Sequence, residues 1–519
     1  MIEKNISANT IRETMFQEMS DKKIFNLAKD YAFEYADNSL TRNVFPTSDA
    51  IAGLKEFDEK LPVNSSSAED VLKQLHKFGS PATVIENGGR FFGFVIGGTL
   101  PASLAARWLA DFWDQNAGMY VTSPIASKLE TVVEGWLRQA FGLPENVVSG
   151  FVSGSTTAVF CALAAARYRV LKKLDWDVNT RGLFNAPKIR IVAGMQAHGA
   201  VLKAISMLGL GRDNIETVEV DDQGRMLADK VPGLDRNTIL VLQAGNVNSG
   251  SFDPFDEICD KAVKADAWIH IDGAFGLWAA CSEDLRHLTK GIEKANSWSV
   301  DAHKTLNTPY DSGIVLCNDR DALFSALHVT GSYLMHSEER DGYSYTPEMS
   351  RRARIVELWA AMKYLGSTGM KELVDGLYER TRQFAFGIKE AGFHVLNDVV
   401  FNQVLVACED DDVTNRTLEL IQKSDECWCG GAQWGNRRVI RVSVSSWANN
   451  GGGYITVGKS ICKSSSGSEI DWKNLVCERI AITCNYNSVK KFTIKIRRSL
   501  AGARDDIHSM RFRGGRSGD

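Results

Sequence analysis

Five side chains that could take part in chemistry follow short apolar segments of this sequence. They comprise two imidazoles, an amide, a carboxylate and an amine, at His198, His303, Asn246, Asp272 and Lys304. An amine that is partly removed from water has a lowered pKa and can attack a carbonyl carbon as a neutral nucleophile. Lys304 ends the run Ser-Val-Asp-Ala-His-Lys and is a candidate for this role. Taken alone, it could equally be one of the many lysines on a protein surface.

Asp272 ends the apolar run Trp-Ile-His-Ile-Asp at 268–272. A carboxylate at this place could keep a pyridinium nitrogen protonated, which makes the ring an electron sink. The small residues Gly273 and Ala274 would let a flat ring lie close to the backbone. The alternative is an Asp that forms a turn or caps a helix. His198 could stack on a cofactor ring, or it could be a histidine of the core.

The run Gly-Phe-Val-Ser-Gly-Ser-Thr-Thr at 150–157 leads into a helical pattern. Free amides at a helix start, together with the hydroxyl groups of Ser155 and Thr156, would bind a phosphate group well. Glycines and hydroxyls are also what a plain helix N-cap requires. The run therefore supports a phosphate site only in combination with the other residues.

The apolar segments before these residues have the pattern of strands in one sheet. Short apolar runs followed by turn or polar residues predict strands at 189–193, 238–243, 267–271, 297–300 and 313–317. Helical periodicity lies between some of them, as at 158–173 and 198–208. This alternation predicts an α/β fold with a mostly parallel sheet covered on both faces. Because ligands bind at the carboxyl ends of such strands, we expect the five side chains to share one pocket.

The rest of the chain divides by its composition. Residues 1–90 predict an N-terminal helical arm, with amphipathic patches at 22–36 and 68–78. A large cofactor-binding domain is expected over 91–370, and strand and helix patterns predict a smaller C-terminal domain over 371–446. Residues 329–350 are rich in Tyr, Ser, Glu and Gly without a clear period, which predicts a long loop with a functional purpose.

Composition narrows the class of protein. The chain is 44% hydrophobic and 24% charged, with a formal net charge of -4, which excludes a disordered, collagen-like or disulfide-dense chain. No run of eighteen apolar residues or secretory signal is found, so we expect a cytoplasmic protein without a membrane span. The ten Cys include no C-x-x-C motif, and we expect no metal site.

Charge separates the last 73 residues from the remainder. Residues 447–519 contain thirteen Lys and Arg and six Asp and Glu, a net charge of +7, which leaves -11 for the first 446 residues. A mildly acidic body without a basic face argues against a nucleic-acid partner. The tail is Gly- and Ser-rich at first and basic later, and a genuine extension, a shifted reading frame or an unspliced intron would each explain it. We assign it no function.

Taken in order, these features resemble the group II pyridoxal-phosphate-dependent amino acid decarboxylases, the family of the glutamate and aromatic L-amino acid decarboxylases. The similarity runs from about Lys73 to Trp447. It includes four further signatures: Arg90-Phe91-Phe92-Gly93-Phe94, Ser123-Pro124 with Glu130, Ser251-Phe252-Asp253-Pro254, and Arg351-Arg352-Ala353-Arg354. The resemblance implies a fold-type I transferase-like architecture, pyridoxal 5′-phosphate as cofactor, and a homodimer with active sites at its interface.

The resemblance also assigns roles to individual residues. Lys304 would bind the cofactor covalently, Asp272 would pair with its ring nitrogen, with Ala274 beside the ring, and His198 would stack on the ring. The phosphate would be held by Ser155 and Thr156, with His303 nearby. Two positions depart from the pattern: Asn246 stands where better-known members carry Thr, and Asp301 stands where relatives often have Asn. Asp301 would add a negative charge near the phosphate if its side chain points inward.

The substrate side of the site is less defined. Arg441 matches the position that holds the substrate carboxylate in the glutamate branch, although a strand Arg is by default a surface residue, and Phe94 is a candidate for the side-chain pocket. The loop 329–350 matches a mobile lid whose Tyr returns a proton to the substrate; Tyr343 and Tyr345 are the candidates, with Tyr333 behind them.

The implied reaction is decarboxylation of an aromatic or acidic L-amino acid to its amine and CO2. Transamination, an aldehyde-forming reaction on the same fold, or a cofactor-binding pseudoenzyme that acts as an interaction subunit are the alternatives.

Overall fold

The computed structural model describes residues 10–39, 41–328, 338–424 and 427–449. The predicted tail 447–519 therefore lies outside the described residues except for its first three. The loop predicted at 329–350 is described only from 338 onward, and Tyr333 lies outside it.

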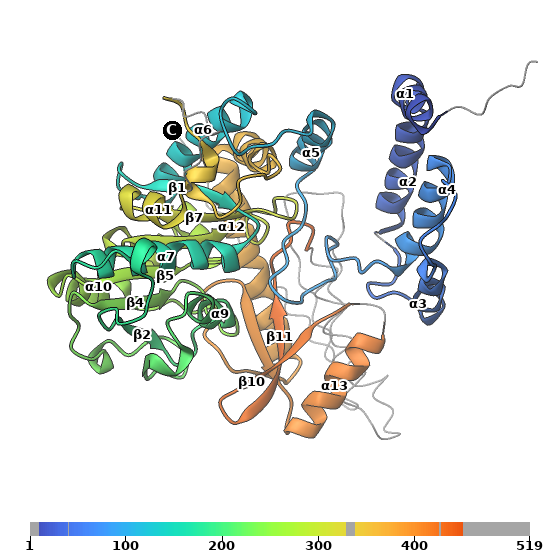
Figure 1. The fold of residues 1–519 in the computed structure, drawn as a ribbon. Coiled ribbons are helices and arrows are strands. Elements are labelled where there is room, and N and C mark those ends of the chain that lie inside the picture. Colours follow the sequence, from blue (N-terminus) through green and yellow to red (C-terminus); the bar gives the residue numbers. More distant parts are fainter. Residues whose placement is uncertain (1–9, 40, 329–337, 425–426, 450–519) are drawn as a thin grey trace, which may run out of the picture.

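The large domain is organised by a seven-stranded sheet in the order β1-β7-β6-β5-β4-β2-β3 (Figure 1). Strands β2, β3, β4, β5 and β6 run parallel to one another. Strand β7 is antiparallel to its two neighbours, β6 and β1. The strands are β1 (Val148–Val152), β2 (Arg190–Gly194), β3 (Ile215–Val218), β4 (Thr238–Gln243), β5 (Trp268–Asp272), β6 (Ser297–Asp301) and β7 (Gly313–Cys317). The predicted α/β fold with a mostly parallel sheet is confirmed.

Helices cover both faces of this sheet, as continuous burial of its central strands requires. One face packs against α7 (Ser155–Lys172), α9 (Gly199–Met207) and α11 (Arg320–Leu327). The other packs against α6 (Pro124–Phe141), α10 (Phe255–Lys264) and α12 (Ile355–Glu390). The short α8 (Val178–Arg181) follows α7. Apolar side chains from every central strand fill the two layers between sheet and helices, so the sheet is a rigid platform for the loops at its ends.

A smaller sheet forms the C-terminal domain. Its four strands are antiparallel and lie in the order β10-β11-β9-β8, with bounds β8 (His394–Val395), β9 (Gln403–Ala407), β10 (Gly430–Trp434) and β11 (Arg437–Ser443). Helix α13 (Asp411–Lys423) packs on β11. Helix α12 runs from the large domain into the small one (Figure 1) and bends at Gly366, whose φ of 59° is a conformation that glycine adopts readily. The predicted boundary at 370 and 371 falls inside this helix.

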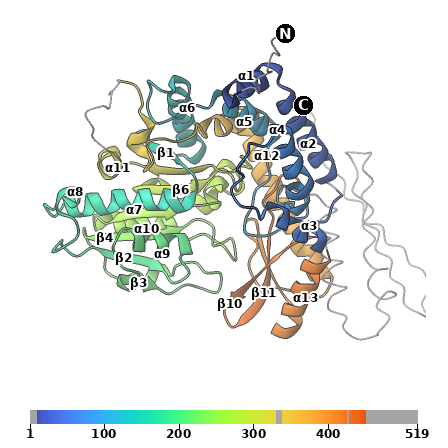
Figure 2. The same cartoon turned by 45° about the vertical axis from the view of Figure 1, so that its right-hand side comes forward.

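The N-terminal arm is helical, and its helices stand beside the body of the molecule (Figures 1 and 2). They are α1 (Ile11–Asp21), α2 (Lys23–Ser39), α3 (Ser48–Gly53) and α4 (Ala68–Gln74), and none of these four helices contains a buried residue. Helix α2 meets α5 (Pro101–Trp113) through two aromatic pairs: Phe25 with Phe112, and Phe33 with Trp108.

None of the helices in the described parts of the chain combines the length and the apolar character that crossing a membrane requires.

Candidate active site

The parallel direction of β2, β4, β5 and β6 brings their carboxyl ends to one edge of the sheet, and β1 points the same way because β7 is antiparallel to both β1 and β6. The loops at this edge carry the residues predicted from the sequence: Ser155, His198, Asn246, Asp272, His303 and Lys304. Hydrogen bonds, an ion pair and a shared cavity join these loops. The polar residues that follow successive strands therefore lie together at one site.

Asp272 is held at the end of β5 with only 5% of its surface exposed. Its Oδ1 accepts hydrogen bonds from the Ser299 hydroxyl and the Ala274 amide, both at 3.3 Å. Asp272 and His198 line the same cavity, which lies between β5 and the loop after β2. A buried carboxylate fixed through one oxygen can present the other to a positively charged partner.

His198 caps the start of α9. Its Nδ1 accepts the Ala200 amide at 3.2 Å, which places the imidazole hydrogen of the neutral ring on Nε2. The ring orientation is thus set by the backbone of the helix that it caps.

Asn246 is almost fully buried in the loop after β4. Its Oδ1 accepts the amides of Asn248 and Ser249 at 2.9 and 3.3 Å, and its Nδ2 donates to Gln196 Oε1 at 3.0 Å. The amide of Asn246 thus joins the loops after β2 and β4, and it holds the shape of the pocket edge.

Lys304 follows β6, and its Nζ lies 3.2 Å from Asp301 Oδ2. The neighbouring His303 has its Nε2 3.5 Å from the same oxygen, while its Nδ1 accepts the Ser312 amide at 3.1 Å. Burial lowers the pKa of His303, and the negative charge of Asp301 only partly opposes this. The ring stacks on Tyr310 at 4.2 Å between centroids. Of these two basic side chains, Lys304 lies closer to Asp301.

The start of α7 completes this corner of the site. Gly154 supplies no side-chain cap, and the Ser155 amide instead donates to Asp301 Oδ1 at 2.6 Å. Thr156 lies exposed in the first turn. The start of α7, the end of β6 and Lys304 are thereby brought into direct contact.

Arg441 reaches the site from β11 of the small domain. It is 8% exposed, its Nη1 donates to the Val247 carbonyl at 2.8 Å, and its buried Nε has no hydrogen-bond partner among the described residues. Burial lowers the pKa of this guanidinium. Val247 is next to Asn246, so the side chain of Arg441 ends at the same edge of the large sheet as the other site residues.

Phe94 belongs to a segment that crosses the Lys304 loop. Gly97 lies so close that an added Cβ would come within 2.1 Å of the Lys304 carbonyl oxygen. Phe94 itself is 60% exposed, has a φ of 52°, and places its ring 5.2 Å from that of Trp428. A positive φ at an aromatic residue is uncommon and is a feature that clusters at functional sites.

The two lid tyrosines predicted as catalytic are not brought to this edge by any contact in the described residues. Tyr345 is buried in the core layer between the sheet and α7, and its hydroxyl accepts from Arg320 Nε at 3.2 Å. Tyr343 is buried in the same short turn, η9 (Gly342–Tyr345), and burial raises the pKa of its hydroxyl. The end of the predicted loop is therefore a buried element rather than an open one.

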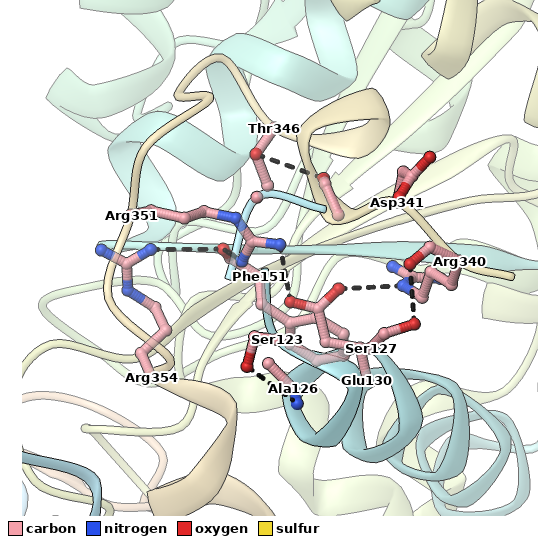
Figure 3. Close-up of polar contacts among 12 residues, drawn as sticks. Ser123, Ala126, Ser127, Glu130, Phe151, Arg340, Asp341, Thr346, Arg351 and Arg354 are labelled. Carbon is pink, nitrogen blue, oxygen red and sulfur yellow. Dashed lines mark hydrogen bonds and ion pairs between the residues drawn. The ribbon is translucent and has the colours of Figure 1, made fainter. Parts of the chain in front are cut away.

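A group of buried charges fastens this element to α6 (Figure 3). Glu130 lies between two guanidinium groups, with Arg351 Nη2 at 2.7 Å and Arg340 Nε at 2.9 Å. Arg340 also pairs with Glu134 at 2.9 Å, and Arg351 donates to the Phe151 carbonyl at 3.2 Å. These contacts hold residues 340–351 against α6 and the end of β1.

Comparison with known proteins identifies the family. Residues 52–407 match the model of the pyridoxal-dependent decarboxylase conserved domain. The chain belongs to the pyridoxal-dependent decarboxylases.

Three similar proteins illustrate its relationships. The decarboxylase is 25% identical to an aromatic-L-amino-acid decarboxylase of Bacillus atrophaeus, over 67% of this chain and 73% of that protein. It is 27% identical to the acidic amino acid decarboxylase GADL1 of Xenopus tropicalis, over 66% and 69% of the two chains. The structure of Oryza sativa TDC with PLP and tryptamine superimposes with a TM-score of 0.79 at 20% identity, covering 86% and 97%.

The decarboxylase is a carboxy-lyase with pyridoxal 5′-phosphate as its cofactor. The donor set of the site fits this group. Lys304 offers an amine for the aldehyde, Asp272 offers a fixed buried carboxylate for the ring nitrogen, and α7 offers the start of an 18-residue helix for the phosphate.

Sequence reasoning missed two residues of this decarboxylase that support the site. Ser299 holds Asp272, and Ser312 orients His303. Ser299 had a signal: Ser297, Ser299 and Asp301 alternate with Trp298 and Val300 in a fully buried strand, so they share one face of β6. No comparable pattern marks Ser312, because it lies in an irregular loop.

Proposed function

We propose that this decarboxylase removes the α-carboxyl group of an aromatic or acidic L-amino acid. The observation that carries the substrate class is Arg441, a buried guanidinium at the active-site edge with no carboxylate partner among the described residues. A buried charge without a partner is costly, and a substrate carboxylate would supply the missing ion pair in bidentate form.

The other residues divide the remaining tasks. Pyridoxal 5′-phosphate, when bound, supplies an electron-accepting ring for the bond broken at the α carbon. Lys304 would hold the cofactor until the substrate amine replaces its own. Asp272 would keep the ring nitrogen protonated, and His198 would cover the ring, since both line the cavity after β2 and β5. Ser155, Thr156 and His303 would surround the phosphate, and Asn246 and Ala274 would shape the ring pocket.

The proton that completes the amine product must come from a group that can approach the α carbon. Tyr345 is poorly suited to this role, because its hydroxyl is held by a hydrogen bond from Arg320. We infer that Tyr343 or Tyr333 is the donor. A tyrosine of raised pKa keeps its proton near neutral pH, and burial raises the pKa of Tyr343.

Phe94 favours an aromatic substrate over an acidic one. Its ring is exposed, it stands on the segment that crosses the Lys304 loop, and it already packs on Trp428. A second aromatic ring, from the substrate, could stack in the same arrangement.

The test of the reaction is a panel of L-amino acids incubated with the cofactor-loaded protein. Release of CO2 with equal amounts of amine is expected from aromatic members, or from acidic members if Arg441 binds a side-chain carboxylate. Keto acid without CO2 would establish transamination, and aldehyde with ammonia would establish the oxidative alternative. Borohydride reduction followed by peptide mapping should label Lys304; a label elsewhere, or none, would overturn the assignment of the lysine.

We also propose that the protein is a homodimer. Helix α1 exposes a stripe of large apolar side chains, and α5 exposes a second group: Ile11, Met15, Phe16 and Met19 on α1, and Leu109, Phe112 and Trp113 on α5. Apolar surface of this kind marks protein interfaces. A monomeric mass in solution at micromolar concentration would contradict this.

A cytoplasmic location is our proposal for the compartment. All seven cysteines in the described residues are free, and most are buried, as expected of a chain kept in a reducing environment. Cell fractionation with a compartment marker would check it.

A further inference from the structure

Asp301 lies at the centre of the corner formed by β6, α7 and the Lys304 loop, and it is 1% exposed. Its two oxygens have different partners. Oδ1 accepts the Ser155 amide at 2.6 Å, whereas Oδ2 faces Lys304 Nζ at 3.2 Å and His303 Nε2 at 3.5 Å. The carboxylate is thus an internal anion seated on the start of a long helix.

The Ser155 amide is the first donor of α7, where the helix dipole favours negative charge. A phosphate bound at this helix start would compete with Asp301 for that amide. An ionised carboxylate can only accept hydrogen bonds, so it could not bond to a phosphate that also only accepts. Two anions at hydrogen-bond distance in a buried corner would repel each other strongly. A protonated carboxyl would instead donate to a phosphate oxygen.

We propose that Asp301 makes binding of the cofactor's phosphate proton-dependent: one proton from solvent is taken up by this carboxyl as the phosphate replaces it on the Ser155 amide. This inference rests on the proposed role of α7 as the phosphate site. Cofactor affinity then falls as pH rises, because each binding event consumes a proton.

The other titratable groups that face Asp301 do not reproduce this dependence. Burial lowers the pKa of His303, so its ring is neutral at pH 7 and above. Burial and the charge of Asp301 raise the pKa of Tyr310, which keeps the phenol neutral there. Asp311, behind His303, has its pKa lowered by its pairs with Arg354 and Arg352 against the opposing effect of burial, and it stays ionised. Lys304 is the remaining basic group, and a probe without an aldehyde leaves its amine unmodified.

The experiment titrates the full-length apoprotein with pyridoxine 5′-phosphate, which has the ring and the phosphate but no aldehyde, between pH 7 and 9. Calorimetry in buffers of different ionisation enthalpy counts the protons taken up. Asp272 would also keep the ring nitrogen of the probe protonated, so pyridoxine, which has the ring without the phosphate, measures the protons that the ring takes up. Wild-type protein should take up about one proton more with pyridoxine 5′-phosphate than with pyridoxine, and its Kd for the phosphate probe should rise about tenfold more per pH unit. Asp301→Asn should take up equal numbers of protons with the two probes, and it should bind pyridoxine 5′-phosphate at least about tenfold more tightly than wild type at pH 8.

Two controls isolate the effect. Asp311→Asn removes an equal charge nearby without touching α7, and it should behave like wild type. Pyridoxine, which lacks the phosphate, should bind all three proteins with the same pH profile.

Equal proton uptake by the wild-type protein with pyridoxine 5′-phosphate and with pyridoxine would overturn the proposal, whether or not the variant folds. Weaker binding by Asp301→Asn would overturn it as well, since the carboxylate would then be helping the phosphate site rather than occupying it. These outcomes are separate from the reaction. CO2 release without proton uptake on phosphate binding would retain the proposed function and reject the role of Asp301. Proton uptake without CO2 release would retain the role of Asp301 and reject the proposed function.

Discussion

The Arg441 guanidinium has a hydrogen bond to the Val247 carbonyl, but burial lowers its pKa and no carboxylate of the described residues faces it. We therefore expect Arg441→Met to raise KM for the preferred amino acid by at least about tenfold, which corresponds to losing one charge-assisted contact. Steady-state kinetics would measure this. Arg438→Met, an exposed neighbour on β11, is the matched control and should leave KM unchanged.

Stability distinguishes this role from a structural one. Arg441→Met removes a buried charge that lacks a carboxylate partner and also removes the hydrogen bond to the Val247 carbonyl, so the free energy of unfolding should fall by no more than about 1 kcal/mol. A large loss of stability with unchanged KM would show that Arg441 holds the Val247 loop rather than a substrate.

The lid tyrosines separate by what their hydroxyl groups touch. Tyr345→Phe should keep kcat within about twofold and lose about 1 kcal/mol of stability, because only the hydrogen bond with Arg320 is removed. We expect either Tyr343→Phe or Tyr333→Phe to remove the proton donor. That variant should have a kcat lowered by about 10²- to 10⁴-fold. A comparable loss in Tyr345→Phe would contradict our assignment. Product analysis would show whether the slow variant makes aldehyde instead of amine.

At this scale the sequence predicted residues on regular elements better than residues on loops. Asp272 ends β5, whose alternation fixes which way its side chain points, and His303 and Lys304 lie in the turn directly after β6. Tyr345 could not be placed in this way, because the backbone around it has no period and its core position depends on packing against α7 and β1. For Asp301, alternation predicts a face of β6 shared with Ser297 and Ser299, but only the fold shows that this face meets the start of α7.

Strand β5 carries a second buried titratable group, His270, directly before the site. Its Nδ1 pairs with the Ser297 hydroxyl at 3.0 Å, and burial lowers its pKa to about 4 from the ordinary 6.5. Between pH 6.5 and about 4 the imidazole is protonated in the unfolded chain but stays neutral in the folded protein. The free energy of unfolding therefore decreases as pH falls through this range. The total loss from this group is about 3 kcal/mol.

Replacement of the imidazole isolates that contribution. We expect His270→Gln to be less stable than wild type at pH 7.5, because the substitution removes the hydrogen bond to Ser297. The difference in stability should become smaller as pH falls toward 4.5, because only the wild-type protein loses stability through His270. Denaturant unfolding at several pH values measures both curves. A difference that stays constant with pH would contradict a neutral buried His270.

The charge cluster on α6 makes the strongest prediction for an element. Glu130 is 1% exposed and pairs with two guanidinium groups, so Glu130→Gln leaves both Arg340 and Arg351 short of a partner in the interior. The expected loss of stability is about 3 kcal/mol or more. Glu69→Gln, which breaks the exposed pair with Lys73 on α4, should cost less than about 1 kcal/mol in the same unfolding assay. Equal losses would show that the cluster contributes no more than a surface pair.

Five strands of the large sheet were predictable within a residue at each end, because each is short, apolar and buried on both faces. Strands β1 and β3 were missed. β1 reads Val-Ser-Gly-Phe-Val, with a central Ser-Gly that hides an apolar run, and β3 is a four-residue edge strand with a Glu and a Thr. Edge strands are shorter and more polar than central ones, so their sequence signal is weaker.

At the scale of the whole molecule, the question is what covers the apolar surface of the N-terminal arm. The four arm helices bury none of their own residues, and the small group of aromatic contacts with α5 covers little of their apolar surface. Isolated helices of this length are marginal in water without tertiary packing. In the homodimer that we propose, a second copy of the chain would supply a further partner surface with the same apolar groups.

A charge placed on this surface should separate the copies. Phe16→Glu on α1 and Leu109→Glu on α5 each put an ionised group into an apolar contact, and we expect either to raise the dimer Kd by at least about tenfold. Leu61→Glu is the matched control, since Leu61 is 93% exposed in the segment before α4 and should leave the mass unchanged. Sedimentation over a range of protein concentrations measures all three. If the two substitutions reduce activity in proportion to the loss of dimer, and if activity returns at high protein concentration, the active site depends on the second chain. A wild-type protein that is monomeric and fully active would refute both the dimer and this dependence.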